Sequence, residues 1–188
     1  MKSKKKNLFT ILTPVLNGEK FITKTIESIK NQSYKNFEHI IIDGGSKDNT
    51  LKIIKNLKHK RLRLIILENK NMWDALNKGI NESKGNIIGI LNSDDYYYKN
   101  GIEIINDYFI KYNFDYIFGA VRKNKRILYR LEKDKVKNKF NIYPSHSASF
   151  FTQKKVHKKI GLYNSNLKFC SDYDLFYKIF TNQSLKGG

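Results

Sequence analysis

The sequence predicts an α/β protein with a mostly parallel sheet flanked by helices and a mixed second half. Through residues 9–112, short apolar runs alternate with segments whose apolar residues recur at helical spacing. This is the pattern of strands joined by crossover helices. After residue 112 the alternation weakens and strand-like runs follow one another, so mixed pairing is expected there. A chain of 188 residues is expected to form a single domain.

The first half contains β-α units in succession, each a short apolar run followed by a segment with Ile or Leu at helical spacing. In chain order they are strand Phe9–Val15, helix Phe21–Gln32, strand His39–Ile42, a helix carrying Leu51, Ile54 and Leu57, strand Leu62–Leu67, helix Trp73–Ser83, strand Ile87–Leu91 and helix Gly101–Tyr112. His39–Ile42 is almost wholly apolar, as expected of a strand buried on both faces. Asp48 or Asn49 can cap the helix that follows it.

The second half shows shorter and less regular elements. We expect strands at Tyr116–Val121 and Arg126–Leu131, joined by a turn at Lys123–Lys125, and a further strand at Ser147–Thr152. One helix is expected near Lys154–Ile160 and is expected to end at Gly161, and a second is expected at Asp172–Phe180.

The chain is strongly basic, with a formal net charge of +19 from 36 basic and 17 acidic side chains. Such an excess is typical of proteins that bind nucleic acid. Here the basic residues are mostly Lys, spread through every segment together with many Asn and Ile, which indicates a bias toward AT-rich codons. We therefore expect no nucleic-acid partner. The densest basic runs, Arg122–Lys139 and Lys154–Lys159, are interpreted as solvated faces or as contacts with anionic lipid head groups.

The sequence also indicates where in the cell the protein lies and whether it can form a disulfide. The apolar runs are much shorter than the roughly 20 residues needed to span a bilayer. The basic start at Lys2–Lys6 is followed by polar and strand-like residues without a small-residue cleavage site, so a cytoplasmic location is expected. Cys170, the one cysteine, cannot form an internal disulfide and is expected to be a buried or half-buried thiol.

Polar clusters follow the expected strands of the first half. They are Thr13–Gly18 after the first strand, Asp43–Ser46 after the second, Asp74, Asn77 and Lys78 on the third helix, and Asn92–Asp95 after the fourth strand. Each cluster alone is also typical of turns. Ligands of open parallel sheets bind beyond the carboxyl ends of the strands, however, so clusters at the same end of successive strands predict one binding crevice.

Asp94 and Asp95 are the most informative of these residues. Adjacent carboxylates directly after an apolar strand repel each other, unless a cation or firm hydrogen bonding offsets the repulsion. Mg²⁺ and Mn²⁺ prefer oxygen ligands and often bridge one or two carboxylates to substrate phosphates. The pair therefore predicts a divalent metal on a diphosphate. The alternative is a helix N-cap with an exposed neighbour.

The clusters together resemble the family 2 glycosyltransferases. The resemblance rests on Thr13–Gly18, Ile42–Thr50, Trp73–Ile80, Leu91–Asp95 and Ser171–Leu175, which occur here in the family's order and cover nearly the whole chain. It implies the GT-A fold, a nucleotide-sugar donor whose base is usually uracil, and inversion at the anomeric carbon by direct displacement. Position 76 departs from the family, because many members carry Arg where this chain has Leu76.

The resemblance also implies a role for each matching residue. Thr13, Pro14 and Asn17 correspond to the first donor-binding loop, Asp43 with Ser46 to the base-binding loop, Asp74 and Asn77 to helix residues near the nucleotide, Asp94 to the ribose or diphosphate contact, Asp95 to the ligand of Mn²⁺ or Mg²⁺, and Asp172 to the catalytic base. Asp172 can equally be a helix N-cap, and Asp174 is the weaker candidate for the base. His146 is a candidate contact of the diphosphate or acceptor, or else a structural residue.

Three functions are compared on this basis. The first is an inverting, metal-dependent transfer of a sugar to a glycan or lipid-linked acceptor in cell-surface polysaccharide or glycolipid synthesis. In this case we expect residues of about 7–97 to bind the nucleotide sugar and residues of about 98–188 to bind the acceptor and carry out catalysis. The second is a truncated nucleotide-sugar-binding protein without catalysis, suggested by the end of the sequence soon after Asp172. The third, a nucleic-acid-binding protein, rests on charge alone.

Overall fold

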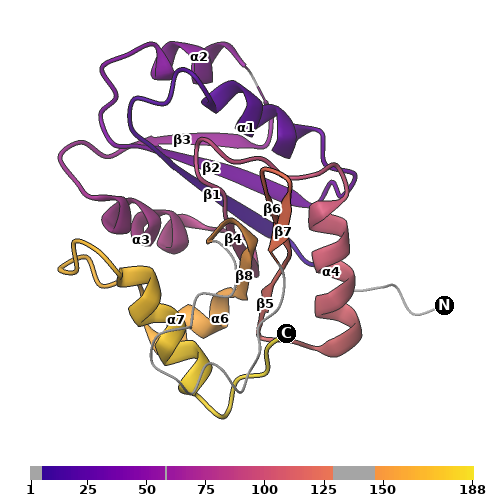
Figure 1. The fold of residues 1–188 in the computed structure, drawn as a ribbon. Helices are drawn as coiled ribbons and strands as arrows, with labels where there is room; N and C mark the ends of the chain where they lie inside the picture. Colours follow the sequence, from indigo (N-terminus) through magenta and orange to yellow (C-terminus); the bar gives the residue numbers. More distant parts are fainter. Residues whose placement is uncertain (1–5, 58, 129–146) are drawn as a thin grey trace.

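The computed structural model, which describes residues 6–57, 59–128 and 147–188, contains a six-stranded sheet with helices on both faces (Figure 1). Its strands are β1 (Phe9–Val15), β2 (Phe37–Asp43), β3 (Leu62–Ile66), β4 (Ile87–Ile90), β5 (Tyr116–Phe118) and β8 (Phe150–Gln153), while β6 (Val121–Lys123) and β7 (Arg126–Leu128) pair separately. The helices are α1 (Ile22–Lys30), α2 (Thr50–Asn56), α3 (Met72–Glu82), α4 (Gly101–Tyr112), α6 (Lys154–Ile160) and α7 (Ser171–Thr181), with a 3₁₀ turn η1 at Ser147–Ser149.

The sheet has the strand order β3-β2-β1-β4-β8-β5. β1 runs parallel to β2 and β4, and β2 runs parallel to β3, whereas β8 is antiparallel to both β4 and β5. The predicted α/β architecture, with a mostly parallel sheet and a mixed second half, is therefore confirmed. Because β1, β2 and β4 are parallel neighbours, the loops that leave their carboxyl ends share one edge of the sheet.

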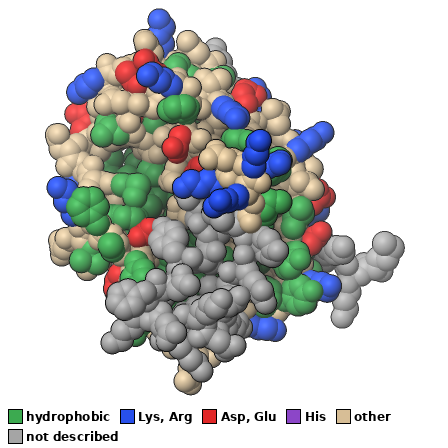
Figure 2. All heavy atoms as spheres, viewed as in Figure 1, with side chains coloured by type: hydrophobic (Ala, Val, Ile, Leu, Met, Phe, Trp, Pro, Cys, Tyr) green, Lys and Arg blue, Asp and Glu red, His purple; other side chains and the backbone are tan. Residues whose placement is uncertain are grey.

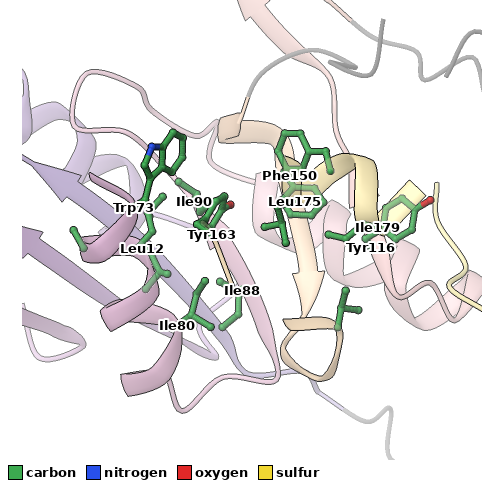
Figure 3. Close-up of a cluster of buried hydrophobic side chains, with 14 of the residues drawn as sticks. Leu12, Trp73, Ile80, Ile88, Ile90, Tyr116, Phe150, Tyr163, Leu175 and Ile179 are labelled. Atoms are coloured by element: carbon green, nitrogen blue, oxygen red, sulfur yellow. The ribbon is translucent and has the colours of Figure 1, made fainter. Parts of the chain in front are cut away.

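Each face of the sheet has its own core. On one face, α3, α6 and α7 pack around a cluster that includes Leu12, Trp73 and Leu175 (Figure 3). On the other face, α4 packs over Phe9 and α1 with α2 over Ile41. Successive residues of a strand point to opposite faces, so a strand between two helix layers must be apolar throughout. This explains the near-continuous apolar run of β2.

Two glycines let neighbouring layers approach closely. A Cβ on Gly79 of α3 would lie 2.9 Å from Leu12 Cδ2, so α3 fits against β1 only without a side chain at this position. A Cβ on Gly89 of β4 would lie 2.5 Å from the ring atom Cε1 of Phe151, its register partner on β8. Gly89 thus marks the seam where the parallel and antiparallel parts of the sheet meet.

The expected strand Tyr116–Val121 is wrong as a single element. β5 ends at Phe118, and β6 begins at Val121 in a different sheet, with Gly119 and Ala120 between them. The turn expected at Lys123–Lys125 is present, and Asn124 adopts the left-handed conformation there, with φ 54°. Strands as short as these carry too little periodicity for their ends to be read from the sequence.

Two other boundaries in this half also differ from expectation. The segment expected as strand Ser147–Thr152 begins with the turn η1, and β8 starts at Phe150. β7 covers the beginning of the expected strand Arg126–Leu131, whose residues from 129 onward lie outside the described part of the chain. None of the helices in the described residues is long and apolar enough to cross a membrane.

Candidate functional site

The loops after β1 and β2 are bound to each other by side chains. The backbone N–H of Asn17 donates to Ser46 Oγ at 2.8 Å, and the backbone N–H of Lys47 donates to Asn17 Oδ1 at 2.8 Å. Asn17 has a φ of 53°, a left-handed conformation that Asn tolerates better than most residues. Asn17 and Ser46 therefore lie together, as the sequence predicted, and fix the relative position of the two loops.

Asp43 is fully buried at the end of β2 and organises the loop that follows. Its Oδ1 accepts hydrogen bonds from the backbone N–H groups of Gly45 at 2.9 Å and Ser46 at 2.7 Å, and its Oδ2 accepts one from Ser46 Oγ at 2.7 Å. Gly45 has a φ of 95°, which favours glycine. These bonds satisfy a buried carboxylate, and they preset the shape of the loop that the resemblance assigns to the base.

Asp48 ties the same loops together further on. Its carboxylate accepts hydrogen bonds from the backbone N–H and hydroxyl of Thr50 and from the backbone N–H of Glu19. Burial alone would raise the pKa of Asp48, but these hydrogen bonds to the charged form hold it below its ordinary value. Asn49 is the N-cap residue of α2, yet it is Asp48 whose side chain accepts from the first turn. Of the two residues proposed as caps, Asn49 holds the N-cap position without a side-chain cap bond, and Asp48 supplies the capping hydrogen bond.

Thr13 and Pro14 lie inside the fold. Both are buried in β1, and Thr13 Oγ1 is 2.9 Å from His39 Nε2 on the neighbouring strand. Burial, reinforced by the charge of His59, lowers the pKa of His39 to about 3, so the ring is neutral at physiological pH. The hydroxyl of Thr13 is therefore engaged with His39 inside the sheet. Thr13 can contact a ligand only through its backbone groups.

Asp94 and Asp95 follow β4 at the same edge. Helix α4 begins at Gly101 with Asn100 as its N-cap, so neither aspartate caps a helix and the N-cap alternative is wrong. Thr25 Oγ1 of α1 lies 2.8 Å from the carbonyl oxygens of both Ser93 and Asp95, which joins this loop to the helix that follows the first loop. Burial, and then the negative charge of Asp95, raises the pKa of Tyr97 far above its ordinary value.

The carboxylates of Asp94 and Asp95 fit a divalent metal that also binds a diphosphate. Asp94 is exposed and Asp95 is half-buried, with Asp95 Oδ2 at 3.4 Å from Asn92 Nδ2. Among the described residues, no group of three His, Cys, Asp or Glu side chains forms a self-contained metal site. Mg²⁺ and Mn²⁺ commonly use one or two carboxylates and take their other ligands from water and substrate phosphates. An acidic pair at the rim of a crevice matches this requirement.

Helix α3 presents one polar side to the 163–165 segment. Asn77 Nδ2 donates to the carbonyl of Tyr163 at 2.8 Å, and the N–H of Tyr163 donates back to Asn77 Oδ1 at 2.9 Å. The rings of Trp73 and Tyr163 stack with their centroids 5.3 Å apart, and Figure 3 shows the two side chains between α3 and α7. Asn77, expected near the nucleotide, therefore positions the segment that leads to α7.

The other polar residues of α3 have separate partners. Asn71 caps the helix, accepting from the N–H of Asp74 at 3.0 Å, and Asp74 lies half-buried in the first turn. Lys78 forms an ion pair with Glu82 at 3.1 Å. Leu76, where many family members carry Arg, is 2% exposed within the core. Asp74 is thus the acidic group that α3 places near its amino end.

Asp172 lies in the first turn of α7 but does not cap it. The N-cap residue is Cys170, with a φ of 66°, so the cap-only interpretation of Asp172 is wrong. Asp172 Oδ1 accepts from the N–H of Tyr173 at 2.8 Å. Asp174 forms an ion pair with Lys178 at 2.6 Å, a surface arrangement that explains it without catalysis. Cys170 is exposed, contrary to expectation, because it sits in the irregular turn before the helix.

The sequence analysis missed a run of aromatic residues beside the acidic pair. A cavity of about 380 Å³ opens next to Asp94 and Asp95 and is lined by Tyr96 and Tyr98 from the loop and Arg122 from β6. Three consecutive tyrosines directly after the aspartates are visible in the sequence, but Arg122 is brought there by the fold. His146 lies outside the described residues.

Comparison with known proteins identifies the family. A profile described as Glycosyl transferase family 2 matches residues 10–174, which includes every loop described above and Asp172. The chain belongs to this family. It is 32% identical to an uncharacterized glycosyltransferase of Rickettsia prowazekii over 95% of this chain and 60% of that protein. It is also 30% identical to chondroitin synthase of Escherichia coli, over 92% of this chain and 26% of that protein.

Solved structures of glycosyltransferases share the fold. S. aureus TarS in complex with UDP-GlcNAc superposes with a TM-score of 0.77 at 21% identity, covering 92% of this chain and 53% of that one. The mannosyltransferase PcManGT from Pyrobaculum calidifontis, in complex with GDP-Man and Mn²⁺, gives 0.75 at 14% identity, covering 97% and 54%. The GT-A fold expected from the resemblance is therefore confirmed. The chain spans about 60% of the length of the Rickettsia relative and little more than half of these structures.

Proposed function

We propose that this glycosyltransferase is an inverting, metal-dependent enzyme that transfers a hexose from a nucleotide-diphosphate sugar to an acceptor hydroxyl. The observation that carries the proposal is that separate β-α units are joined by hydrogen bonds between side chains and backbone at the carboxyl edge of the sheet. Asn17 is joined to Ser46, and Thr25 is joined to the carbonyl of Asp95. A crevice at this edge is where open α/β sheets bind their ligands.

The donor is proposed to be a UDP-sugar. TarS is described in complex with UDP and UDP-GlcNAc, and PcManGT in complex with GDP-Man and Mn²⁺, which supports a nucleotide sugar as the ligand of this fold. In this chain the loops built around Asp43 and Asn17 are assigned to the nucleoside, with Pro14, Ser46, Asp74 and Asp94 as further contacts. The preset loop around Asp43 favours binding, because little conformational freedom is left to lose.

Asp95, with Asp94 beside it, is proposed to hold Mn²⁺ or Mg²⁺. Such a metal, when bound, supplies positive charge that stabilises a departing diphosphate. The protein's own contribution is to fix the backbone of this loop. The carbonyl of Asp95 accepts from Thr25, and the N–H of Asp95 donates to the carbonyl of Asn92 at 3.1 Å. A carboxylate on a fixed backbone keeps its orientation when the donor binds.

Asp172 is proposed as the catalytic base. In a direct displacement, the acceptor oxygen forms a bond to the anomeric carbon while the bond from that carbon to the diphosphate oxygen breaks, which inverts the configuration. The nucleoside diphosphate leaves with the bonding electrons, and the acceptor proton passes to the Asp172 carboxylate. Asn77 supports this role indirectly, because it fixes the backbone of Tyr163, upstream of α7.

The acceptor is proposed to be a glycan or lipid-linked glycan of a cell-surface polysaccharide or glycolipid. Residues of about 7–97 would then bind the donor and residues of about 98–188 the acceptor, within one domain. A cytoplasmic location, with peripheral contact to an anionic membrane surface through basic side chains, fits this role. The truncated, non-catalytic alternative is not favoured, because the family match extends through Asp172.

A thermal-shift screen tests the donor proposal. UDP-, GDP- and dTDP-sugars are added with and without Mn²⁺, since a ligand at about 100 times its Kd adds about 2.7 kcal/mol of stability. We expect a UDP-sugar to raise the melting temperature in the presence of Mn²⁺ and the Asp95→Asn variant to lose this rise. Asp107→Asn, which removes an exposed carboxylate from α4, is the matched control and should keep it. The absence of a metal-dependent shift with every nucleotide sugar would contradict the proposal.

A further inference from the structure

The cavity beside Asp94 and Asp95 has no described lining residue from the loops after β1 and β2, which are assigned to the nucleoside. Its described lining comes from the loop between β4 and α4, from α4 itself, and from the β5–β6 and η1–β8 segments. Figure 1 shows the loop between β4 and α4 passing close to β6, with α4 beside it. Among the described lining residues, Asp94 and Asp95 are the ones shared with the proposed donor site. A volume of about 380 Å³ is in the range of small-molecule sites.

The walls of the cavity are aromatic and rigidly supported. Tyr97 points inward, donating from its hydroxyl to the carbonyl of Ile90 at 3.1 Å and packing against Phe151 with ring centroids 5.7 Å apart. This anchors the loop and turns its neighbours outward, so that Tyr96 is 47% and Tyr98 54% exposed. Exposed aromatic rings on a fixed loop offer flat apolar surfaces with a polar hydroxyl at the edge.

The rim of the cavity is basic on the side of the β6–β7 hairpin. Arg122 lines the cavity, and its Nη1 lies 3.5 Å from the hydroxyl of Tyr98. Lys123, Lys125 and Arg126 are exposed on the same hairpin, and Figure 2 shows blue side chains gathered over β6 and β7. Outside the lining, Lys24 Nζ lies 3.8 Å from the ring centroid of Tyr96. Arg122 is thus the basic side chain that the described lining supplies, in addition to the carboxylates of Asp94 and Asp95.

We propose that this cavity binds the acceptor chain, and that the acceptor is an anionic saccharide. A sugar ring would lie against Tyr96 and Tyr98, while Arg122 binds the carboxylate or phosphate carried by the chain. The shared chemistry is an anion attached to a polyhydroxylated ring, and guanidinium groups bind both kinds of anion through paired N–H donors. The inference rests on the proposed function, because the cavity lining includes Asp95, the proposed metal ligand. Asp172 is not among the described lining residues, so the cavity would hold the part of the acceptor chain beyond the reacting sugar.

A lipid chain fits the cavity less well than a saccharide does. An alkyl or prenyl chain requires apolar walls throughout, whereas Asp94, Asn100 and Arg122 put charged and amide groups into this lining. Such groups would lose their hydration against a hydrocarbon chain, but they can hydrogen-bond to sugar hydroxyls. The observations therefore favour the saccharide, and binding to lipid is an outcome that the experiment separates.

Titration calorimetry without nucleotide tests the proposal on the full chain. The ligands are a glucuronate-containing disaccharide, the corresponding disaccharide phosphate and a neutral disaccharide. We expect one or both anionic ligands to bind about tenfold tighter than the neutral one, a difference that an added charge-assisted contact can supply. The two anionic arms distinguish a carboxylate from a phosphate. Vesicles containing phosphatidylglycerol form the lipid arm.

Matched variants assign the effect to the cavity. Arg122→Gln should remove the preference for the anionic ligand, and Tyr98→Ala should weaken both anionic and neutral ligands. Lys125→Gln, which removes the same charge from the same hairpin outside the cavity lining, should leave both unchanged. The proposal is overturned if the three disaccharides bind equally, if Lys125→Gln acts like Arg122→Gln, or if vesicles bind and saccharides do not.

The donor screen is repeated on the same variants to separate the two proposals. Arg122→Gln should keep the Mn²⁺-dependent shift with a nucleotide sugar, because it lies outside the donor loops. If the wild-type protein shows no nucleotide shift but keeps an Arg122-dependent preference for anionic saccharides, the donor proposal fails and the cavity remains a saccharide site. If the nucleotide shift is present and anionic saccharides bind no better than the neutral one, the acceptor proposal alone fails.

Discussion

The two parts of the molecule are stabilised in different ways. From β1 to β4, buried parallel strands carry loops that are tied together by side-chain hydrogen bonds, as between Asn17 and Ser46. From α4 to α7, the strands are short and antiparallel, and aromatic packing dominates, as between Phe150 and Phe176 with ring centroids 4.7 Å apart. Hydrogen-bonded loops require particular residues at particular positions, whereas aromatic packing tolerates exchange. The motifs of the family are therefore easier to recognise between β1 and β4, the half that is proposed to bind the donor.

The largest expected effect concerns Asp172, the proposed base in the second part. Asp172→Asn should lower kcat by about 10²–10⁴, the range of general-base catalysis, while the Mn²⁺-dependent nucleotide shift is retained. Asp174→Asn is the control, because its ion pair with Lys178 is on the surface and contributes little. Transfer kinetics and the thermal shift are measured on both variants. Equal losses of kcat in the two variants would contradict the assignment of Asp172, rather than Asp174, as the base.

The next effect is a pH dependence that both parts share. Burial lowers the pKa of His39 in β2 to about 3 and of His157 in α6 to about 4, against an ordinary value near 6.5. Below pH 6.5 the unfolded chain binds protons that the folded chain does not, so stability falls as the pH drops from about 6.5 toward 4.

Each histidine can be examined separately by urea unfolding at several pH values. In the wild-type protein, the lowered pKa of His157 should reduce the free energy of unfolding by roughly 2–4 kcal/mol between pH 7 and 4, and His157→Gln should abolish this reduction. His39→Gln should remove a similar loss from the first part. A histidine variant whose stability keeps the full wild-type slope would show that the native ring is not held neutral.

A smaller effect is expected at the seam between the two parts. Gly89→Ala should destabilise the protein by about 1–3 kcal/mol, because the added Cβ would lie 2.5 Å from the ring of Phe151. Gly101→Ala is the control, since its Cβ would meet its nearest atom at 3.7 Å and its helical position favours Ala by up to about 1 kcal/mol. Chemical denaturation measures both, and a neutral Gly89→Ala would mean that β4 and β8 are loosely packed.

The smallest effect is expected where α3 contacts the second part. Asn77→Ala removes both hydrogen bonds to the backbone of Tyr163 and should cost about 1 kcal/mol, because the half-buried site admits water. Asn81→Ala, an exposed position one turn further along α3, should change stability very little. Unfolding curves compare the two, with proteolysis near residues 163–165 as a second readout. Identical curves would argue against a positioning role for Asn77.

Much of the fold followed from the sequence, for physical reasons that fail in the second part. Strand β2 was predicted because burial on both faces demands an apolar run. The position of Asp95 at the sheet edge was predicted because polar residues after parallel strands share an edge, while its role as a metal ligand stays a prediction. The interruption between β5 and β6 at Gly119 was missed because strands of three residues are too short to show an alternation of apolar and polar residues. Arg122 was missed because the fold, and no local pattern, brings it next to Tyr98.

Some side-chain roles were also hidden from the sequence. Thr13 matches the motif of the first donor loop, yet its hydroxyl is bound to His39 inside the sheet. Asn77 matches a nucleotide-proximal position, yet its amide holds the backbone of Tyr163. A motif specifies which residue stands at a position, but the direction of the side chain depends on partners that lie far away in the chain.

The anchoring of Tyr97 has a consequence for how the two proposed ligands influence each other. Asp95 and Tyr98 stand on one short loop whose middle is fixed by the bond from Tyr97 to Ile90. Because the loop is held at its middle, a ligand at one end leaves the other end in place. The proposed donor and acceptor should therefore bind independently, each with an affinity that the other does not change.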